Sequence, residues 1–179
     1  AKVNKTQIEE LNTRGRKACE QAEVNSAVLY AKESAELTKS MPLPYVFTKP
    51  SAKGYTSYSN TIIVNMIKAR FKISEVYMLT FMESDGSGDF TAYKDLNNYP
   101  TEKLGNRVFF FAFKDTDGAF KFTGGRLRMM YEGNGVYSEP VIFPYSPLMD
   151  SDPKFPYDHA RNELGFESVF FMDGTKVKK

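Results

Sequence analysis

Apolar and small side chains recur at alternating spacings of three and four residues through the first part of the chain. That spacing predicts one long helix over residues 5–39, in a segment rich in Ala, Glu, Lys and Leu where Gly15 is the only breaker. The recurring positions form a heptad-like seam of mostly small side chains, in which Asn25 fills the one gap. The seam consists of Ile8, Leu11, Gly15, Ala18, Ala22 and Leu29.

A second apolar stripe lies beside the seam toward the end of the same helix. It consists of Val24, Val28, Ala31 and Ala35. One interpretation is that the whole helix packs on its own domain, as amphipathic helices do. The other is that the small side chains of the seam let a second backbone approach closely, so that the first half of the helix contacts another copy or a partner. The sequence leaves both interpretations open.

The long helix is expected to end at Met41-Pro42-Leu43-Pro44, because proline has no amide hydrogen and restricts the residue before it. After a connection rich in Pro, Tyr and Ser, Ser59 or Asn60 is placed to cap a second helix over residues 60–71. The buried face predicted for this helix consists of Ile62, Ile63, Met66, Ile67 and Phe71.

The following part of the chain has the pattern of strands. Residues 73–82 are almost continuously apolar and predict a buried strand, and residues 107–113 are apolar on both alternating faces, which predicts a central strand. Nearer the C-terminus we expect a short helix over residues 157–164, a strand over residues 168–172 and a frayed basic tail over residues 176–179.

Turn signals between residues 107 and 143 predict an antiparallel meander. Asp115-Thr116-Asp117-Gly118 turns the chain back into a strand, and Asn134-Gly135 is the strongest hairpin signal present. Gly124-Gly125 marks either another turn or a bulge within one longer strand. Residues 90–105 give no clear pattern.

Together these elements predict an α+β fold, with the long N-terminal helix and the second helix packed on an antiparallel-rich, Phe-rich sheet. The chain has 179 residues, with 15 Phe, 11 Tyr and no Trp, and this aromatic content suits a densely packed sheet. We expect residues 1–40 to form the helix and residues 41–179 to form a single domain.

The chain has few residues for metal or nucleophile chemistry. His159 is its only histidine and Cys19 its only cysteine, so zinc motifs and a disulfide within the chain are excluded. We expect His159 to be a surface or helix-terminal residue and Cys19 to be a buried structural thiol. Asp115 and Asp117 resemble part of a calcium loop without its remaining ligands, and a hairpin turn explains them. No catalytic residue, metal or cofactor is predicted, although paired carboxylates leave acid–base catalysis open.

Charge is distributed unevenly, since no acidic residue occurs from Leu37 to Ser74. Lysines and arginines bind phosphates, and aromatic rings stack on unpaired bases, so single-stranded nucleic-acid binding is an alternative function. Solubilising lysines and core tyrosines would give the same composition. The residues predicted for this alternative are Lys49, Lys53, Tyr55, Tyr58, Lys68, Arg70, Lys72, Arg126 and Arg128.

A third hypothesis is a small-ligand sensor of the PAS or Cache type. Such domains also combine a long N-terminal helix with an antiparallel sheet, and the segment from Asn134 to Pro140 resembles a segment of Cache domains. The resemblance covers these few residues and assigns no family. It implies a ligand pocket, which we expect Tyr and Phe side chains to line.

We rank first the hypothesis that this is a non-catalytic interaction or assembly protein that self-associates through the seam. This function requires no catalytic, metal-binding or ligand-binding side chains. Its partner would be a second copy or another protein, with single-stranded nucleic acid as the alternative. No apolar run approaches the roughly 20 residues that span a membrane, and no membrane partner is expected. The single cysteine favours a reducing compartment, so we predict a cytoplasmic location.

Overall fold

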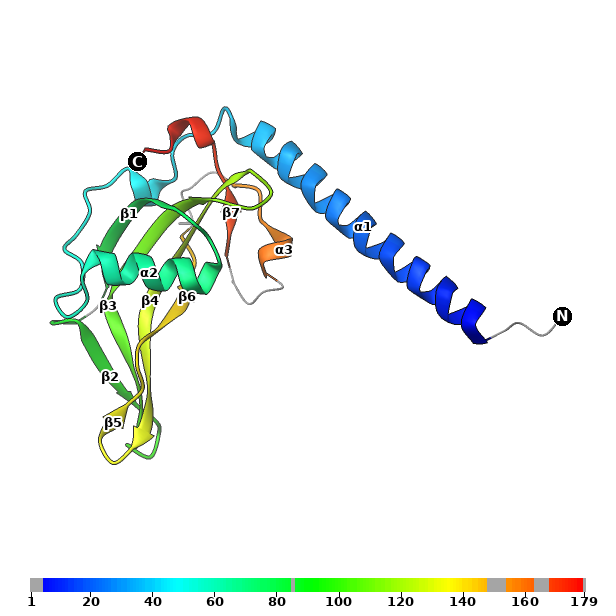
Figure 1. Ribbon diagram of the computed structural model, residues 1–179. Coiled ribbons are helices and arrows are strands. Elements are labelled where there is room, and N and C mark those ends of the chain that lie inside the picture. Colours follow the sequence, from blue (N-terminus) through cyan, green and yellow to red (C-terminus); the bar gives the residue numbers. More distant parts are fainter. Residues whose placement is uncertain (1–4, 85, 148–153, 163–167, 179) are drawn as a thin grey trace.

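The computed structural model describes residues 5–84, 86–147, 154–162 and 168–178 (Figure 1). It confirms the predicted α+β fold, with a long first helix, a second helix and an antiparallel sheet rich in aromatic residues. The helical elements are α1 (Lys5–Thr38), η1 (Tyr45–Phe47), α2 (Asn60–Phe71), α3 (His159–Asn162) and η2 (Gly174–Lys176). The strands are β1 (Val76–Glu83), β2 (Phe90–Lys94), β3 (Pro100–Lys114), β4 (Phe120–Gly133), β5 (Val136–Tyr137), β6 (Val141–Tyr145) and β7 (Phe170–Phe171).

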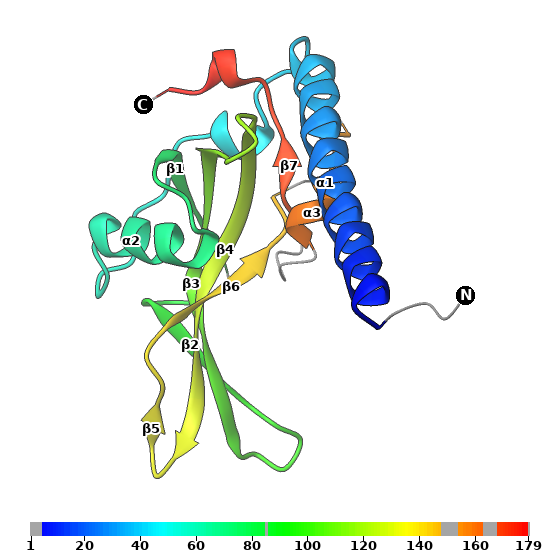
Figure 2. The same ribbon diagram turned by 45° about the vertical axis from the view of Figure 1, so that its right-hand side comes forward.

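The sheet is built around one long hairpin formed by β3 and β4. Strands β1 and β2 pair successively with β3, and β7, β6 and β5 pair successively with the other edge of β4, all antiparallel. Figure 2 shows the consequence, a long narrow sheet whose end with β2 and β5 extends well beyond α2. The central position predicted for residues 107–113 is confirmed, and the segment 90–105 without a clear pattern contains β2 and the start of β3.

Gly124 and Gly125 lie inside β4 and make no turn. Their ladder with β3 is continuous, with Gly124 opposite Phe110 and Gly125 opposite Phe109. A Cβ at position 124 would lie 2.5 Å from the Phe110 ring, and one at position 125 would lie 3.2 Å from the Phe109 ring. The two glycines are therefore the space into which neighbouring aromatic rings fit, which explains why the turn that their sequence suggested is absent.

The α2 face of the sheet holds the larger core. Ser59 caps α2 by accepting a hydrogen bond from the Ile62 amide at 3.4 Å, as predicted. Ile63, Ile67 and Phe71 are buried against Phe109, Phe111 and Phe113, and the rings of Phe71 and Phe111 meet edge-on with centroids 5.0 Å apart. Ile62, expected on the buried face, is exposed instead, because it precedes Ile63 by one position and so points about 100° away.

On the opposite face of the sheet the described residues form short covering segments rather than a long helix. The main core on this face joins Ala112 of β3 and Phe122 of β4 to side chains from segments near the two ends of the domain. These side chains include Met41, Leu43, Phe47, Phe155, Phe170, Met172 and Val177. The tail that was predicted to fray is instead held against the domain at two residues. Val177 packs in this core, and Lys176 pairs with Asp173 at 3.4 Å. The predicted strand 168–172 is realised as β7 and the predicted helix 157–164 as α3, and residues 163–164 lie outside the described residues.

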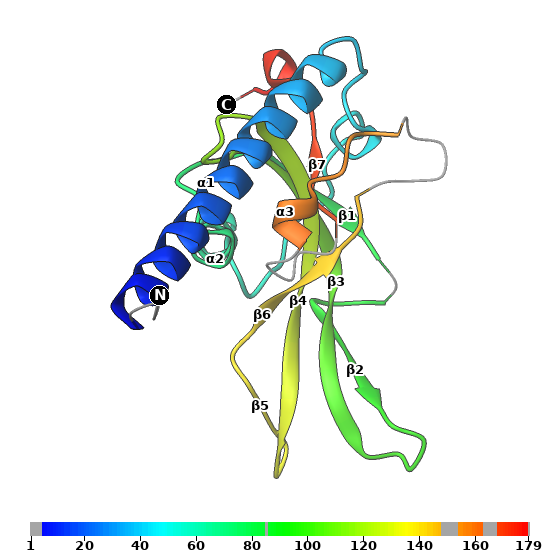
Figure 3. The same ribbon diagram turned by 90° about the vertical axis from the view of Figure 1, so that its right-hand side faces the viewer.

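Helix α1 rests on the domain only by its C-terminal turns. Ala31 is buried against Ala119 and Phe171, and the Tyr30 hydroxyl donates to the Tyr157 carbonyl oxygen at 2.9 Å. Every residue from Lys5 to Tyr30 is exposed. Figure 1 shows the N-terminal part of α1 extending away from the sheet, and Figure 3 shows α3 beside the part that docks.

Candidate interaction site

The seam on α1 points away from the domain. Successive residues of an α-helix are rotated by about 100°, so Ala22, nine residues before the buried Ala31, points about 180° from it. By the same geometry the other seam residues point within about 60° of the Ala22 direction. Leu11 is 64% exposed and Leu29 is 56% exposed. We call the positions Ile8, Leu11, Gly15, Ala18, Ala22, Asn25 and Leu29 the outward face.

The outward face carries no charge. Between residues 7 and 29 every charged side chain lies within about 100° of the Ala31 direction, on the other side of the helix. These side chains are Glu9, Glu10, Arg14, Arg16, Lys17, Glu20 and Glu23. Up to Glu23 the helix is therefore amphipathic in the reverse sense to the usual one: its charged side faces in the direction of the domain, and its uncharged side faces solvent. From Val24 onward the side toward the domain is apolar.

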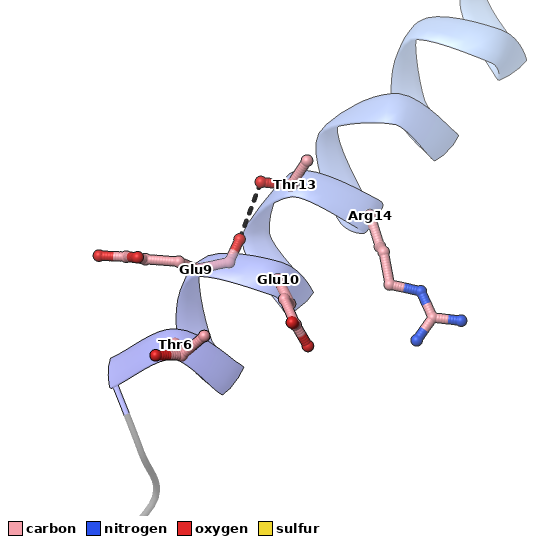
Figure 4. Close-up of a pocket in the computed structure, with 5 residues that line it drawn as sticks. All are labelled: Thr6, Glu9, Glu10, Thr13 and Arg14. Atoms are coloured by element: carbon pink, nitrogen blue, oxygen red, sulfur yellow. Dashed lines mark hydrogen bonds between the residues drawn. The ribbon is translucent and has the colours of Figure 1, made fainter.

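Figure 4 shows part of this charged side near the start of α1. The depression there is lined by Thr6, Glu9, Glu10, Thr13 and Arg14. All five belong to one helix, and the hydrogen bond among them runs from the Thr13 hydroxyl to the Glu9 carbonyl oxygen at 2.8 Å. Because no second element contributes a wall, the depression is a gap between solvated side chains.

The second predicted stripe is divided by the edge of the domain. Ala31 is buried and Ala35 half-buried, whereas Val24 and Val28 are more than half exposed. These two valines line one wall of an open pocket of about 470 Å³ between α1 and the sheet. The sensor hypothesis expected Tyr and Phe to line a pocket, but the opposite wall of this one is charged. That hypothesis stays a prediction.

The charged wall is an ionic cluster centred on Lys121 of β4. Its ammonium lies 2.8 Å from Asp115 Oδ2, 2.5 Å from Asp117 Oδ2 and 2.6 Å from Asp158 Oδ2, and the side chain is 2% exposed. Arg161 donates from Nε to Asp115 at 2.8 Å and from Nη2 to the same carboxylate. The cluster thus joins the β3–β4 turn, β4 and α3.

The ammonium occupies the place that a cation would take among these carboxylates. Asp115, Asp117 and Asp158 bring their oxygens within 4.8 Å of one another, which suits a metal ion. The Lys121 ammonium already lies between them, hydrogen-bonded to Asp115 and Asp117 and ion-paired with Asp158. Burial alone would raise the pKa of Asp115, yet the hydrogen bonds from Arg161 and Lys121 outweigh it and lower that pKa. The fragment of a calcium loop seen in the sequence is therefore an ion-pair site for lysine.

The ionic cluster also supports the surface on which α1 rests. Arg161 Nη1 donates to the carbonyl oxygen of Phe71, the last residue of α2, at 2.8 Å. The Lys121 ammonium lies 4.8 Å from the centroid of the Phe171 ring, and that ring contacts Tyr30 of α1 edge-on at 5.7 Å. The ring of Phe171 therefore lies between the buried Lys121 ammonium and Tyr30, so the ionic cluster supports the contact through which α1 docks.

Cys19 is exposed, so the expectation of a buried structural thiol is wrong. The small side chains around it suggested burial, but they belong to the part of α1 that extends beyond the domain. His159 begins α3 and is exposed, as expected, with its ring 5.0 Å from that of Tyr157.

The residues predicted for nucleic-acid binding do not share one surface. Leu127 packs in the α2 core, and because side chains alternate along a strand, Arg126 and Arg128 point to the opposite face of the sheet from Lys68 and Arg70 of α2. Arg128 also pairs with Glu102 at 2.5 Å. Lys49 and Lys53 lie in the connection before α2, and Lys72 caps its end.

Tyr55, predicted to stack on bases, is buried. Its hydroxyl donates to the Arg107 carbonyl oxygen at 2.5 Å and accepts from the Leu127 amide at 3.2 Å. This is the point where the register between β3 and β4 shifts, so the phenol replaces ladder hydrogen bonds that the irregularity interrupts. Tyr58 is half-buried, with its ring edge-on to Tyr55 and Phe90. Nucleic-acid binding stays a prediction.

The buried phenol gives stability a dependence on alkaline pH. Burial raises the pKa of Tyr55 to about 12, against an ordinary value of 10. Its contribution is therefore complete below pH 10 and is lost as pH rises toward 12, because only the unfolded chain ionises readily in that window. We expect the free energy of unfolding of wild type to fall by about 2 kcal/mol more than that of Tyr55→Phe between these pH values. Urea titrations of both proteins measure this, and parallel pH profiles would contradict it.

Sequence reasoning missed Lys121, Asp158 and Arg161. One signal was present, since Lys121 stands between Phe120 and Phe122 in a strand whose neighbours on both sides are apolar. A lysine whose side chain points inward from a buried strand requires carboxylate partners. The carboxylates nearest to Lys121 in the sequence are Asp117 and Asp115, in the turn before β4.

No family model, curated protein or solved structure matches this chain. None of the helices among the described residues combines the length and the apolar character that crossing a membrane requires.

Proposed function

We propose that this protein is a non-catalytic assembly module that associates with a second copy of itself through the outward face of α1. The observation that carries the proposal is the reversed amphipathicity of α1. Its uncharged, heptad-spaced side is directed away from the domain, and its charged side is directed toward it.

The energetics of an unsupported helix favour a partner. Most helical stability in proteins comes from packing of an apolar stripe, and isolated helices shorter than about 12–15 residues are marginal in water. The part of α1 from Lys5 to Glu23 is exposed throughout, and the contacts of α1 with its own domain begin after it. Gly15 lowers its intrinsic helix propensity by about 1 kcal/mol relative to alanine. A second helix on the outward face supplies the missing burial.

The chemistry of the outward face suits another helix. Gly15, Ala18 and Ala22 leave no bulky side chain across two turns, so two backbones approach closely there. Ile8, Leu11 and Leu29 flank this section and are each about half or more exposed, so they gain the most from contact. Among the described residues, the contacts with the domain are made from the other side of α1, which leaves the outward face exposed to a partner.

The test is the molecular mass in solution of wild type and of Ala18→Glu/Ala22→Glu. We expect wild type to sediment as a dimer at micromolar concentration and the variant as a monomer, since two carboxylates per chain would be buried in the interface. The monomeric variant should also lose helical circular dichroism from the first half of α1.

The matched control adds the same charge to the opposite side of α1. Thr6 and Thr13 point in the direction of Ala31, and both are exposed. Thr6→Glu/Thr13→Glu should remain dimeric. A wild type that stays monomeric at high concentration would remove the proposal, and so would equal dissociation of both double variants.

A further inference from the structure

We infer that the two copies of α1 associate antiparallel, in the register that places Ala18 of one chain opposite Ala22 of the other. This inference rests on the proposed function and specifies its geometry. It follows from the side chains that each orientation brings together along the heptad positions of α1, which continue from the outward face to Lys32 and Glu36.

The antiparallel register matches residue sizes along the interface. Opposing positions then sum to 40, so Leu11 faces Leu29 of the second copy and Ala18 faces Ala22 at the centre. Gly15, which has no side chain, faces Asn25, which needs room. Each opening in one helix therefore receives a larger side chain from the other. A parallel pair would instead place Gly15 opposite Gly15, which leaves a gap, and Asn25 opposite Asn25, which crowds two side chains together.

Charge separates the two orientations more sharply. In a parallel pair Lys32 would face Lys32 of the second copy, and one turn later Glu36 would face Glu36. Like charges in contact destabilise a helix pair. In the antiparallel register Lys32 lies opposite Ile8 of the second copy, where the alkyl part of the lysine can cover the isoleucine while its ammonium stays in water.

The flanking positions add an attractive pair. In an antiparallel pair, side chains beside the seam on the same edge of both helices lie next to each other. This arrangement brings Lys5 next to Glu33 of the second copy, and by symmetry it does so twice. Within one chain these residues are 28 positions apart, about 42 Å along α1, so they cannot pair intramolecularly. Both are exposed.

Spin labels distinguish the orientations. In a Cys19→Ser background, which removes the only native cysteine, a label at Glu10→Cys would lie about 30 Å from its counterpart along the axis, because residue 10 is level with residue 30 of the second copy. A label at Glu20→Cys would be level with its own counterpart. The antiparallel dimer therefore gives one long and one short distance.

Each result has a separate meaning. Two short distances would show a parallel dimer, which overturns the inference and leaves the proposed association standing. No distance between chains at either site, together with a monomeric mass, would overturn both. Residues 10 and 20 are exposed on the charged side, so labels there leave the outward face unchanged.

A charge exchange tests the register independently. Glu33→Lys places two ammonium groups together at each end of the antiparallel dimer, and we expect it to weaken dimerisation about five- to tenfold. Adding Lys5→Glu restores opposite charges, and the double variant should return to within about twofold of wild type. Failure of Lys5→Glu to rescue Glu33→Lys would overturn the register, because only an antiparallel pair brings these positions together.

Discussion

Replacing Lys121 with Met is expected to lower the free energy of unfolding by about 3–5 kcal/mol, which for a chain of this length lowers Tm by about 6–20 °C. The side chain keeps its approximate volume but loses the ammonium that contacts Asp115, Asp117 and Asp158. Three neighbouring carboxylates, two of them buried, then lose their shared cation, while the Arg161 guanidinium continues to pair with Asp115. Thermal unfolding followed by circular dichroism measures the change.

Lys39→Met is the matched control. Lys39 also forms an ion pair, with Glu36 at 2.6 Å, but both side chains are about 60% exposed. Such pairs contribute at most about 1 kcal/mol, so this variant should be close to wild type. Equal stability of Lys121→Met and wild type would show that the carboxylates are neutralised in some other way.

The Lys121→Met deficit should also depend on pH. In wild type the pKa of Asp115 is lowered, so its contribution is present above the ordinary carboxyl value near 4 and is lost as pH falls below it. Without the ammonium the carboxylates repel one another, so acid stabilises the variant by neutralising them. The two proteins should therefore converge between pH 7 and pH 4, whereas a deficit caused by packing alone would not change.

Gly105→Ala is expected to cost about 2–5 kcal/mol for a different reason. A Cβ at this position would overlap the buried Tyr55 hydroxyl and would lie 2.8 Å from Cζ of the same ring. Tyr55 must then move, which leaves the Arg107 carbonyl and the Leu127 amide without their hydrogen bonds and disturbs the α2 core. Chemical denaturation of the purified variant measures the loss.

A double-mutant cycle separates this overlap from a general intolerance of alanine in β3. Tyr55→Phe removes the oxygen that the new methyl group would meet, at a cost of about 1–3 kcal/mol for the two unpaired backbone groups. The combined variant Gly105→Ala/Tyr55→Phe should then be less destabilised than the sum of the two changes. If the losses of stability in the two single variants simply add in the double variant, the strain caused by Gly105→Ala does not arise from contact with the Tyr55 hydroxyl.

Local patterns predicted α1, α2 and the meander because each is encoded by neighbouring residues. The spacing of Ile8 and Leu11, the cap at Ser59 and the turn at Asn134-Gly135 all act over a few positions. Local patterns did not predict which side of α1 docks on the domain, because that side is determined by contacts with Phe171, which is distant in the sequence. The reversed amphipathicity is visible only once Ala31 is known to be buried.

The ionic cluster and Tyr55 were beyond sequence reasoning for the same physical reason. Lys121 and Asp158 meet because β7 pairs with β4 on one edge and with the segment before α3 on the other. Tyr55 reaches the β3–β4 ladder across 72 positions. Sequence patterns assigned Tyr55 to base stacking and gave Lys121 no role, whereas the structure buries both side chains. The basic segment was visible in the sequence as a charge pattern. The sequence did not show that Arg126 and Arg128 lie on the opposite face of the sheet from the basic residues of α2.

The docking of α1 onto β7 has a consequence for the order in which the protein is made and folded. Tyr30 meets a carbonyl 127 positions later in the chain, and its ring rests on Phe171. A ribosome therefore releases α1 long before the strand that anchors it exists. Closing so large a loop is entropically costly, so we expect anchoring to follow sheet formation. During that interval two nascent helices on neighbouring ribosomes could find each other before either has found its own domain.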